Sequence, residues 1–154
     1  MSNMQLLQPL SLALTQNALI EARAGTGKSC TITTLYLRAL LGLLDDKLEL
    51  RPLTIEQILV VTFTEAATQE IKNRVRTKLQ ETQKAILLGK SKDNTLNQLL
   101  NEFVQRFCQI NPDSNHEKAN LYAYHRLQDA ITLIDEASIF TIHGFSHRCL
   151  KQFA

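Results

Sequence analysis

The sequence lacks several features that would assign a chain to a specialised class. Its 17 basic and 15 acidic side chains leave a formal net charge of only +2, so no overall electrostatic field demands a nucleic acid as partner. The three cysteines (Cys30, Cys108 and Cys149) are odd in number and widely spaced, which argues against a disulfide framework. Such a set favours a reducing compartment, and we therefore expect a cytoplasmic protein.

Long apolar runs and targeting signals are also missing. No apolar run approaches the ~20 residues of a membrane-spanning helix, and the N-terminus lacks the basic start of a signal peptide. We therefore expect no membrane as a partner. The hydrophobic share of 44% nevertheless excludes a disordered chain. With 154 residues, the sequence can form one domain or a part of one.

The most informative stretch that is present is a loop that fits the phosphate-binding pattern, with alanine in place of the first glycine. It comprises Ala22, Arg23, Ala24, Gly25, Thr26, Gly27, Lys28 and Ser29. The two glycines let backbone N–H groups approach a triphosphate, while Lys28 supplies a cation and Ser29 a hydroxyl for Mg²⁺. The loop therefore predicts binding of ATP and Mg²⁺, with Lys28 as the catalytic residue and Ser29 as the residue that contacts the metal.

The residues around the loop fit the same prediction, because a phosphate-binding loop follows a strand and opens a helix. Residues 19–22 have the pattern of a short buried strand, and leucine spacing predicts a helix over residues 29–44. Gln16 could reach the adenine of a nucleotide, although a surface glutamine is the commoner explanation. Arg23 could touch phosphate or DNA, but a solvated side chain at the edge of the loop is the plainer interpretation.

A second strand and helix follow. Residues 58–63 form an almost continuous apolar run, typical of a strand covered on both faces, and the order strand, helix, strand predicts a parallel sheet in an α/β fold. Thr64 is a good N-cap for a helix that we expect to run to about Leu88, where Gly89 ends it. For most of the basic side chains of this helix, a solvated face is a slightly better interpretation than contact with DNA; these side chains are Lys72, Arg74, Arg76, Lys78 and Lys84.

Helical spacing continues over residues 95–135 and is interrupted at residues 111–115. Residues 139–142 then have the pattern of a third strand, and a helix begins at His143. We therefore expect three parts. Residues 1–89 form the core with the phosphate-binding loop, residues 90–136 form a helical insertion, and residues 137–154 form the third strand and its helix.

Two patterns suggest sites that the spacing does not support. Asp135 and Glu136 look like the acidic pair that NTPases place at a strand end, but the apolar residues before them keep helical spacing, so we place the pair at a helix terminus. His143 and His147 could share a helix face as metal ligands do, but no third ligand stands at convincing spacing. We therefore expect neither a catalytic acidic pair nor a zinc site here.

Three blocks, EARAGTGKS, VVTFTEAATQEIKNRV and FTIHGFSHR, resemble in this order motifs I and Ia and the TxHGF-type motif of superfamily 1 DNA helicases of the UvrD/Rep kind. More narrowly, the chain resembles the RecB family, the beta subunits of exodeoxyribonuclease V. The resemblance implies a RecA-like P-loop motor domain, of which this chain is the N-terminal part. It also implies an ATP-dependent DNA helicase and exonuclease of double-strand-break repair and recombination, with RecC- and RecD-like partner subunits, acting on single-stranded DNA and duplex ends.

In this family the second and third blocks contact single-stranded DNA. The resemblance therefore implies DNA-binding roles for Thr62, Phe63, Thr64, Thr141, His143 and Phe145. Physical chemistry agrees at Phe63, because open α/β sheets bind ligands at the carboxyl ends of their strands and an aromatic ring there can stack on any base. Without the neighbouring blocks, a core position would be the better interpretation of this phenylalanine.

The sequence departs from the family in what is missing. The motifs that supply the magnesium aspartate, the catalytic glutamate and the arginines at the γ phosphate are not in it, nor are the second motor domain and the nuclease domain. We therefore expect the 154-residue chain alone to be inactive. Two alternatives stay open: another phosphate-loop enzyme, such as a small-molecule kinase, which the second and third blocks argue against, and a module that binds DNA or a partner without hydrolysis.

Overall fold

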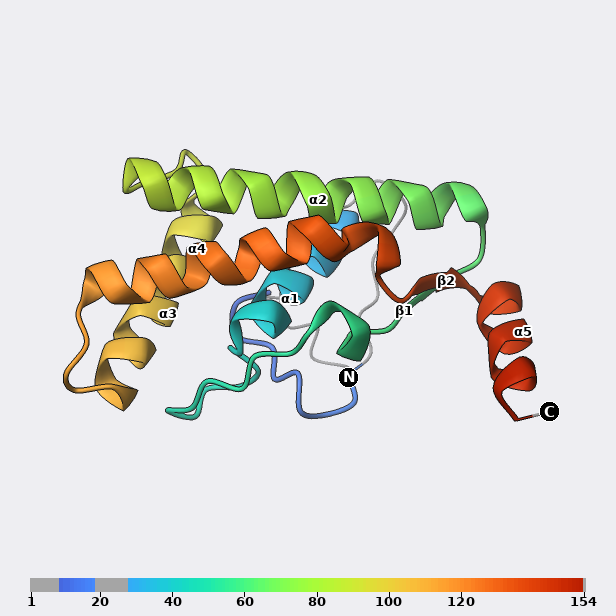
Figure 1. The fold of residues 1–154 in the computed structure, drawn as a ribbon, viewed down its shortest axis with the longest axis horizontal. Coiled ribbons are helices and arrows are strands. Elements are labelled where there is room, and N and C mark those ends of the chain that lie inside the picture. The colour runs from blue at the N-terminus through green and yellow to red at the C-terminus, as the bar shows by residue number, and fades with distance from the viewer. Residues whose placement is uncertain (1–8, 19–27, 154) are drawn as a thin grey trace, which may run out of the picture.

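The computed structural model describes residues 9–18 and 28–153, without the side chains of Lys28 and Ser29. The described chain is mostly helical and contains a small parallel sheet (Figure 1). Two short 3-10 turns, η1 and η2, precede the two strands. In chain order the elements are α1 (Lys28–Leu41), η1 (Ile55–Gln57), β1 (Val60–Thr62), α2 (Glu65–Leu88), α3 (Asn94–Ile110), α4 (His116–Leu133), η2 (Ile134–Glu136), β2 (Ile139–Thr141) and α5 (Ile142–Gln152).

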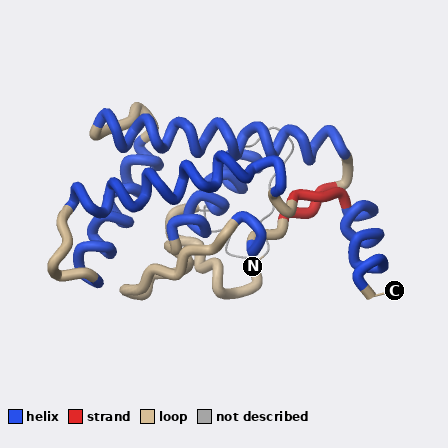
Figure 2. The backbone as a smooth tube through the Cα atoms, viewed as in Figure 1, coloured by secondary structure: helices blue, strands red, loops and turns tan. Residues whose placement is uncertain are grey.

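The helices α1 to α4 form one body, and the two strands lie at its end. The long helix α2 runs beside α4, α1 packs against both, and α5 stands beyond the strands (Figures 1 and 2). The α/β prediction is therefore met by a two-stranded sheet among the described residues. The strand predicted at residues 19–22 lies outside them. No helix in the described ranges is long and apolar enough to cross a membrane.

The first helix ends earlier than the leucine spacing predicts. The expected end was Leu44, but α1 stops at Leu41 because Gly42 adopts a φ of +86°. A Cβ at Gly42 would lie 2.6 Å from the backbone nitrogens of Arg51 and Pro52, so the following loop packs directly on this glycine. The leucines after Gly42 continue the apolar pattern, and Leu43 is buried in the core without being helical.

The second helix follows its prediction closely. Thr64 has extended backbone angles, and its hydroxyl accepts a hydrogen bond from the Ala67 N–H at 3.1 Å, as an N-cap does. The helix runs to Leu88 and ends at Gly89, whose φ is +81°. Its buried face follows the helical period through Thr68, Ile71, Val75, Leu79, Thr82 and Ala85.

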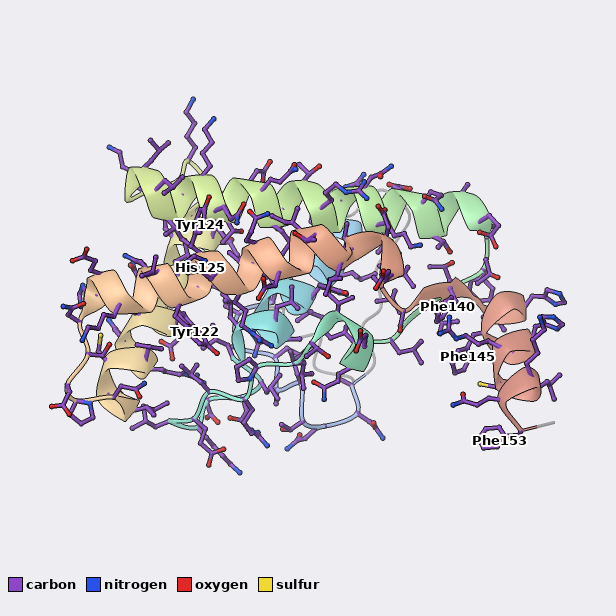
Figure 3. All side chains as sticks on the ribbon, in the orientation of Figure 1. Tyr122, Tyr124, His125, Phe140, Phe145 and Phe153 are labelled. Carbon is purple, nitrogen blue, oxygen red and sulfur yellow. The ribbon has the colours of Figure 1, made fainter. Side chains whose placement is uncertain are left out.

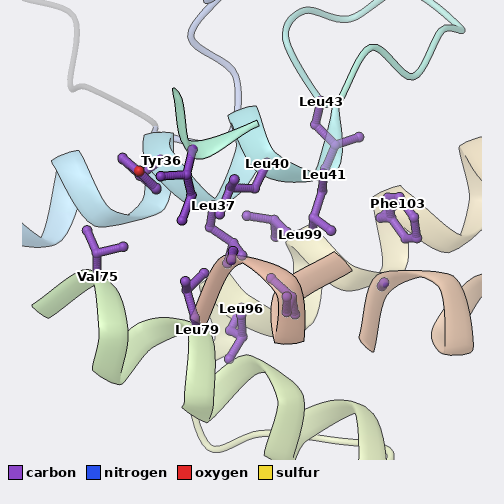
Figure 4. Close-up of a cluster of buried hydrophobic side chains, with 14 of the residues drawn as sticks. Tyr36, Leu37, Leu40, Leu41, Leu43, Val75, Leu79, Leu96, Leu99 and Phe103 are labelled. Atoms are coloured by element: carbon purple, nitrogen blue, oxygen red, sulfur yellow. The ribbon is translucent and has the colours of Figure 1, made fainter. Parts of the chain in front are cut away.

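The core is built where α1, α2 and α3 pack around α4 (Figure 4). Its largest fully buried side chains include Leu37 and Leu40 of α1, Leu79 of α2 and Phe103 of α3. Each such side chain contributes roughly 1.5–3 kcal/mol through removal of apolar surface from water. Ile139 of β2 is buried in the same core, so the strand is anchored to the helical body by its apolar side chain.

Arg38 ties the loops to this body through backbone carbonyls. The Arg38 guanidinium is buried and donates to the carbonyls of Pro9, Leu12 and Leu43 at 2.6–3.1 Å. Burial and the neighbouring Arg106 lower the pKa of Arg38, while Asp45 raises it. These contacts satisfy carbonyls that no helix or strand partner reaches.

The α3–α4 hairpin confirms the helical prediction for residues 95–135 and the break between them. Asp93 caps α3 by accepting from the N–H groups of Thr95 and Leu96, and Asn115 caps α4. Phe103, Phe107 and Tyr122 form an aromatic cluster across the two helices, with ring centroids 5.4–6.1 Å apart. Such contacts fix how the hairpin closes.

Candidate nucleic-acid interface

The two motif-bearing strand ends lie side by side. Strands β1 and β2 pair in parallel with Val60 opposite Ile139 and Thr62 opposite Thr141. Each strand is three residues long, shorter than the predicted ranges 58–63 and 139–142, and β2 ends where α5 begins. Their carboxyl ends therefore meet at one edge, which brings together segments 78 residues apart in the chain.

Phe63 projects from this edge into solvent. It follows β1 directly, precedes the α2 cap Thr64, and its side chain is 89% exposed. Leaving an aromatic ring in water forfeits the free energy of burial, so a core role for Phe63 does not fit the described chain. The exposed ring instead offers a flat surface on which a base could stack.

The threonines at the edge use their hydroxyls internally. Thr141 accepts from the Gly144 N–H at 3.0 Å and caps α5, as Thr64 caps α2. The Thr62 hydroxyl is buried and lies 2.6 Å from the Thr68 hydroxyl. Sequence reasoning missed Thr68, whose only signal was its spacing from Thr62 and Thr64. The hydroxyls of Thr64 and Thr141 accept in these bonds, so a phosphate at this edge could meet their O–H groups as well as helix N-terminal N–H groups.

The third block forms β2 and the start of α5. The helix begins at Ile142, one residue before the prediction, and none of its residues is buried. His143 is exposed, while Phe145 stacks on Phe140 with ring centroids 6.4 Å apart (Figure 3). The Arg148 guanidinium covers the Phe140 ring at 5.0 Å. Phe145 therefore supports the packing of α5 on β2, and His143 faces solvent.

A cavity of about 270 Å³ opens beside the edge, between α2, η2, β2 and α5. Lys72 and Arg148 line it, and neither forms an ion pair with a described carboxylate. Three carboxylates also line it, those of Glu65, Asp135 and Glu136. Since acidic side chains outnumber basic ones, we assign no phosphate to this cavity.

Most basic side chains of α2 have partners on the protein. Arg74 pairs with Glu70, Arg76 with Asp135, and Lys78 with Asp93. A solvated and ion-paired face therefore explains these side chains, as the sequence pattern favoured. Hydrogen bonds to Lys78 and to backbone N–H groups hold the pKa of Asp93 below its usual value, although burial opposes them.

The acidic pair lies in η2, a 3-10 turn that extends α4, and not at a strand end. This confirms the placement made from helical spacing. Both side chains are exposed, and Asp135 is engaged by Arg76. Among the described residues no group of three or more His, Cys, Asp or Glu could hold a metal ion.

The nucleotide half of the prediction falls at the boundary of the described chain. Ala22, Arg23, Ala24, Gly25, Thr26 and Gly27 lie outside the described residues. Lys28 and Ser29 are the first two residues of α1, which places the end of the loop at a helix N-terminus. Gln16 is exposed in a bend just after Leu14, whose N–H donates to the carbonyl of Leu44.

Comparison with known proteins gives a consistent result. The pattern of the UvrD/REP helicase N-terminal domain matches residues 2–154. The chain is 42% identical over 150 residues to the RecBCD enzyme subunit RecB of Haemophilus influenzae, covering 96% of this chain and 12% of that protein. It is 44% identical over 145 residues to the same subunit of Escherichia coli, covering 94% of this chain and 11% of that protein. The chain thus spans about a tenth of the length of these relatives.

Proposed function

Because this chain belongs to the UvrD/REP helicase N-terminal domain family, we propose that it is the N-terminal part of the first motor domain of a RecB-like, ATP-dependent DNA helicase and exonuclease subunit. In this role it would bind nucleotide at the loop of residues 22–29 and single-stranded DNA at the strand edge. Residues 90–136 would be a helical insertion into the motor core.

The observation that carries the DNA part of the proposal is the strand register. Pairing of Thr62 with Thr141 sets Phe63 and the N-termini of α2 and α5 on one edge. An exposed aromatic ring beside two helix N-termini suits a base and its neighbouring phosphates. Thr62, Thr64 and Thr141 would build this edge, with Phe63, His143 and Phe145 as the aromatic groups near the strand.

The nucleotide part rests on the loop pattern and on the start of α1 at Lys28. The donor set fits ATP with Mg²⁺: backbone N–H groups of the glycine-containing loop would hold the phosphates, Lys28 would hold the β and γ oxygens, and the Ser29 hydroxyl would contact the metal. Bound Mg²⁺ would neutralise charge on the phosphates. Lys28 would stabilise the negative charge that develops on the transferring group. Gln16 is the proposed contact to adenine.

The relatives are named as RecB subunits of a RecBCD enzyme. We infer from this that the parent protein works with RecC- and RecD-like subunits on duplex ends and on the single strands made from them, in repair and recombination. We place it in the cytoplasm on the cysteine pattern given above.

The test is ATP hydrolysis by the full-length parent protein with and without single-stranded DNA. We expect DNA to stimulate hydrolysis and Lys28→Ala to lower the stimulated rate about a hundredfold or more, because a preorganised charge at the phosphoryl group is lost. Lys84→Ala is the control, since it removes an exposed lysine that makes no described ion pair and lies near the other end of α2 from the strand edge.

Each other result argues for a different function. ATP hydrolysis at the same rate with and without DNA would favour another phosphate-loop enzyme, and no hydrolysis at all would favour a module that binds DNA or a partner. A Lys28→Ala variant with unchanged nucleotide affinity and ATP turnover would contradict any role of the loop in ATP hydrolysis.

A further inference from the structure

We propose that Thr68 is a positioning residue for the DNA site, because its hydroxyl holds the turn that presents Phe63 to a base. This inference rests on the proposed function of the strand edge. Thr68 lies one turn into α2, is 3% exposed, and cannot touch DNA itself. It acts on the residues before and after Phe63.

The contacts form a closed group around the turn. The Thr68 hydroxyl lies 2.6 Å from the Thr62 hydroxyl and donates to the Thr64 carbonyl at 3.1 Å. Thr62 also reaches the Thr64 carbonyl at 3.1 Å, and the Phe140 carbonyl of β2 at 3.5 Å. Both neighbours of Phe63 are therefore bound to the same buried pair of hydroxyls.

The consequence for Phe63 is a fixed backbone with a free ring. The two hydroxyls carry two protons, so at most two of the four contacts are hydrogen bonds at any time, and β1 is linked to α2 whenever one hydroxyl donates to the other. With Thr62 and Thr64 held, the ring keeps its place at the edge although it is 89% exposed. An exposed group that is already in position loses less entropy when a base stacks on it.

A matched control exists in the same helix. The Thr82 hydroxyl of α2 donates to the carbonyl four residues earlier, that of Lys78, at 2.7 Å, and Thr82 is fully buried. Thr68 makes the same bond to Thr64, but it alone adds the link to Thr62. A comparison of the two threonines therefore separates the link to the strand from an ordinary buried hydroxyl in a helix.

The experiment measures DNA-stimulated ATP hydrolysis by the full-length parent protein, titrated with an oligonucleotide that carries 2-aminopurine, a base whose fluorescence reports stacking. The variants are Thr68→Val, Thr68→Ser and Thr82→Val. We expect Thr68→Val to raise the half-saturating DNA concentration roughly three- to tenfold and to reduce the fluorescence change, as loss of one buried hydrogen bond implies. The maximal rate at saturating DNA should stay close to that of Thr82→Val. Thr68→Ser keeps the hydroxyl and should behave as the unmodified protein does.

Two results would overturn the inference. One is an equal effect of Thr68→Val and Thr82→Val on DNA titration and fluorescence, and the other is a failure of serine to restore both. If valine prevents folding, Thr68→Ala removes the same hydroxyl and takes its place. Phe63→Leu, measured in parallel, distinguishes failure of the stacking site from failure of the role of Thr68. If Phe63→Leu leaves the DNA titration unchanged, the stacking site itself is contradicted. If Phe63→Leu weakens DNA binding but Thr68→Val does not, only the role of Thr68 is contradicted.

Discussion

At the scale of single residues, the exposed ring of Phe63 is the feature most directly open to test. We expect Phe63→Leu in the full-length parent protein to weaken binding of single-stranded DNA about five- to thirtyfold, since stacking of one base on an aromatic ring contributes roughly 1–2 kcal/mol. Equilibrium binding at fixed salt measures the effect. Because the ring is 89% exposed, the fold should not change.

The control for this substitution is Phe153→Leu, which removes another exposed ring, at the end of α5 and away from the strand edge. It should leave DNA affinity within about twofold of the unmodified protein. Equal losses in the two variants would show that the effect is not specific to the edge, and no loss at Phe63 would contradict base stacking there.

The site residues differed in how far the sequence could predict them. A DNA-binding role for Phe63 was predicted from a motif and stays a prediction, and the structure adds that the residue is exposed and not in the core. The hydroxyl of Thr62 could not be assigned from sequence, because only the fold brings Thr68 within 2.6 Å of it. The residues of a phosphate-binding loop are consecutive in the chain, so the sequence alone can identify them. A hydrogen bond between two elements depends on how those elements pack, which the sequence does not show directly.

At the scale of elements, two glycines end helices under different constraints. Both adopt positive φ, but a Cβ at Gly42 would meet backbone nitrogens at 2.6 Å, and one at Gly89 would meet nothing within 4 Å. We expect Gly89→Ala to lower the free energy of unfolding by about 1–2 kcal/mol from the backbone conformation alone. Gly42→Ala should cost at least about 3 kcal/mol, because the loop at Arg51 must also move.

Thermal unfolding followed by circular dichroism measures the difference, and each glycine serves as the control for the other. Equal losses of stability would mean that the loop at Arg51 and Pro52 moves away from the new Cβ at position 42 with no loss of free energy. A larger loss at Gly89 would contradict the packing described for Gly42.

Element boundaries followed the sequence where a capping residue marks them. Thr64 and Gly89 were correctly predicted as the ends of α2, and residues 111–115 separate α3 from α4 as expected. The end of α1 was wrong because Leu43 and Leu44 keep the apolar spacing after the helix has stopped. The predicted strands were too long because a strand of three residues is too short to show the alternation of apolar and polar side chains that would mark its ends.

At the scale of the whole molecule, Arg126 joins the α3–α4 hairpin to the rest. Its guanidinium donates to the carbonyls of Leu40 and Leu53, both at 2.8 Å, across 86 and 73 residues of sequence. We expect Arg126→Gln to lower the free energy of unfolding by about 1.5–3 kcal/mol, since hydrogen bonds from a charged donor are lost. Chemical denaturation measures this loss.

Arg74→Gln is the matched control. Among the described residues, Arg74 pairs with the exposed Glu70 one turn away and with no other carboxylate, so its loss should cost no more than about 1 kcal/mol. A similar cost for the two substitutions would mean that Arg126 does not fasten α4 to α1.

The register of the sheet has a consequence for how the chain folds. Thr62 and Phe140 are 78 residues apart, and bringing the ends of so long a loop together costs entropy that grows with the logarithm of its length. Two strands of three residues form too few hydrogen bonds to offset that cost early in folding. We expect the packing of α2 against α4 to shorten this distance first, so that the surface proposed for DNA assembles after the helical body.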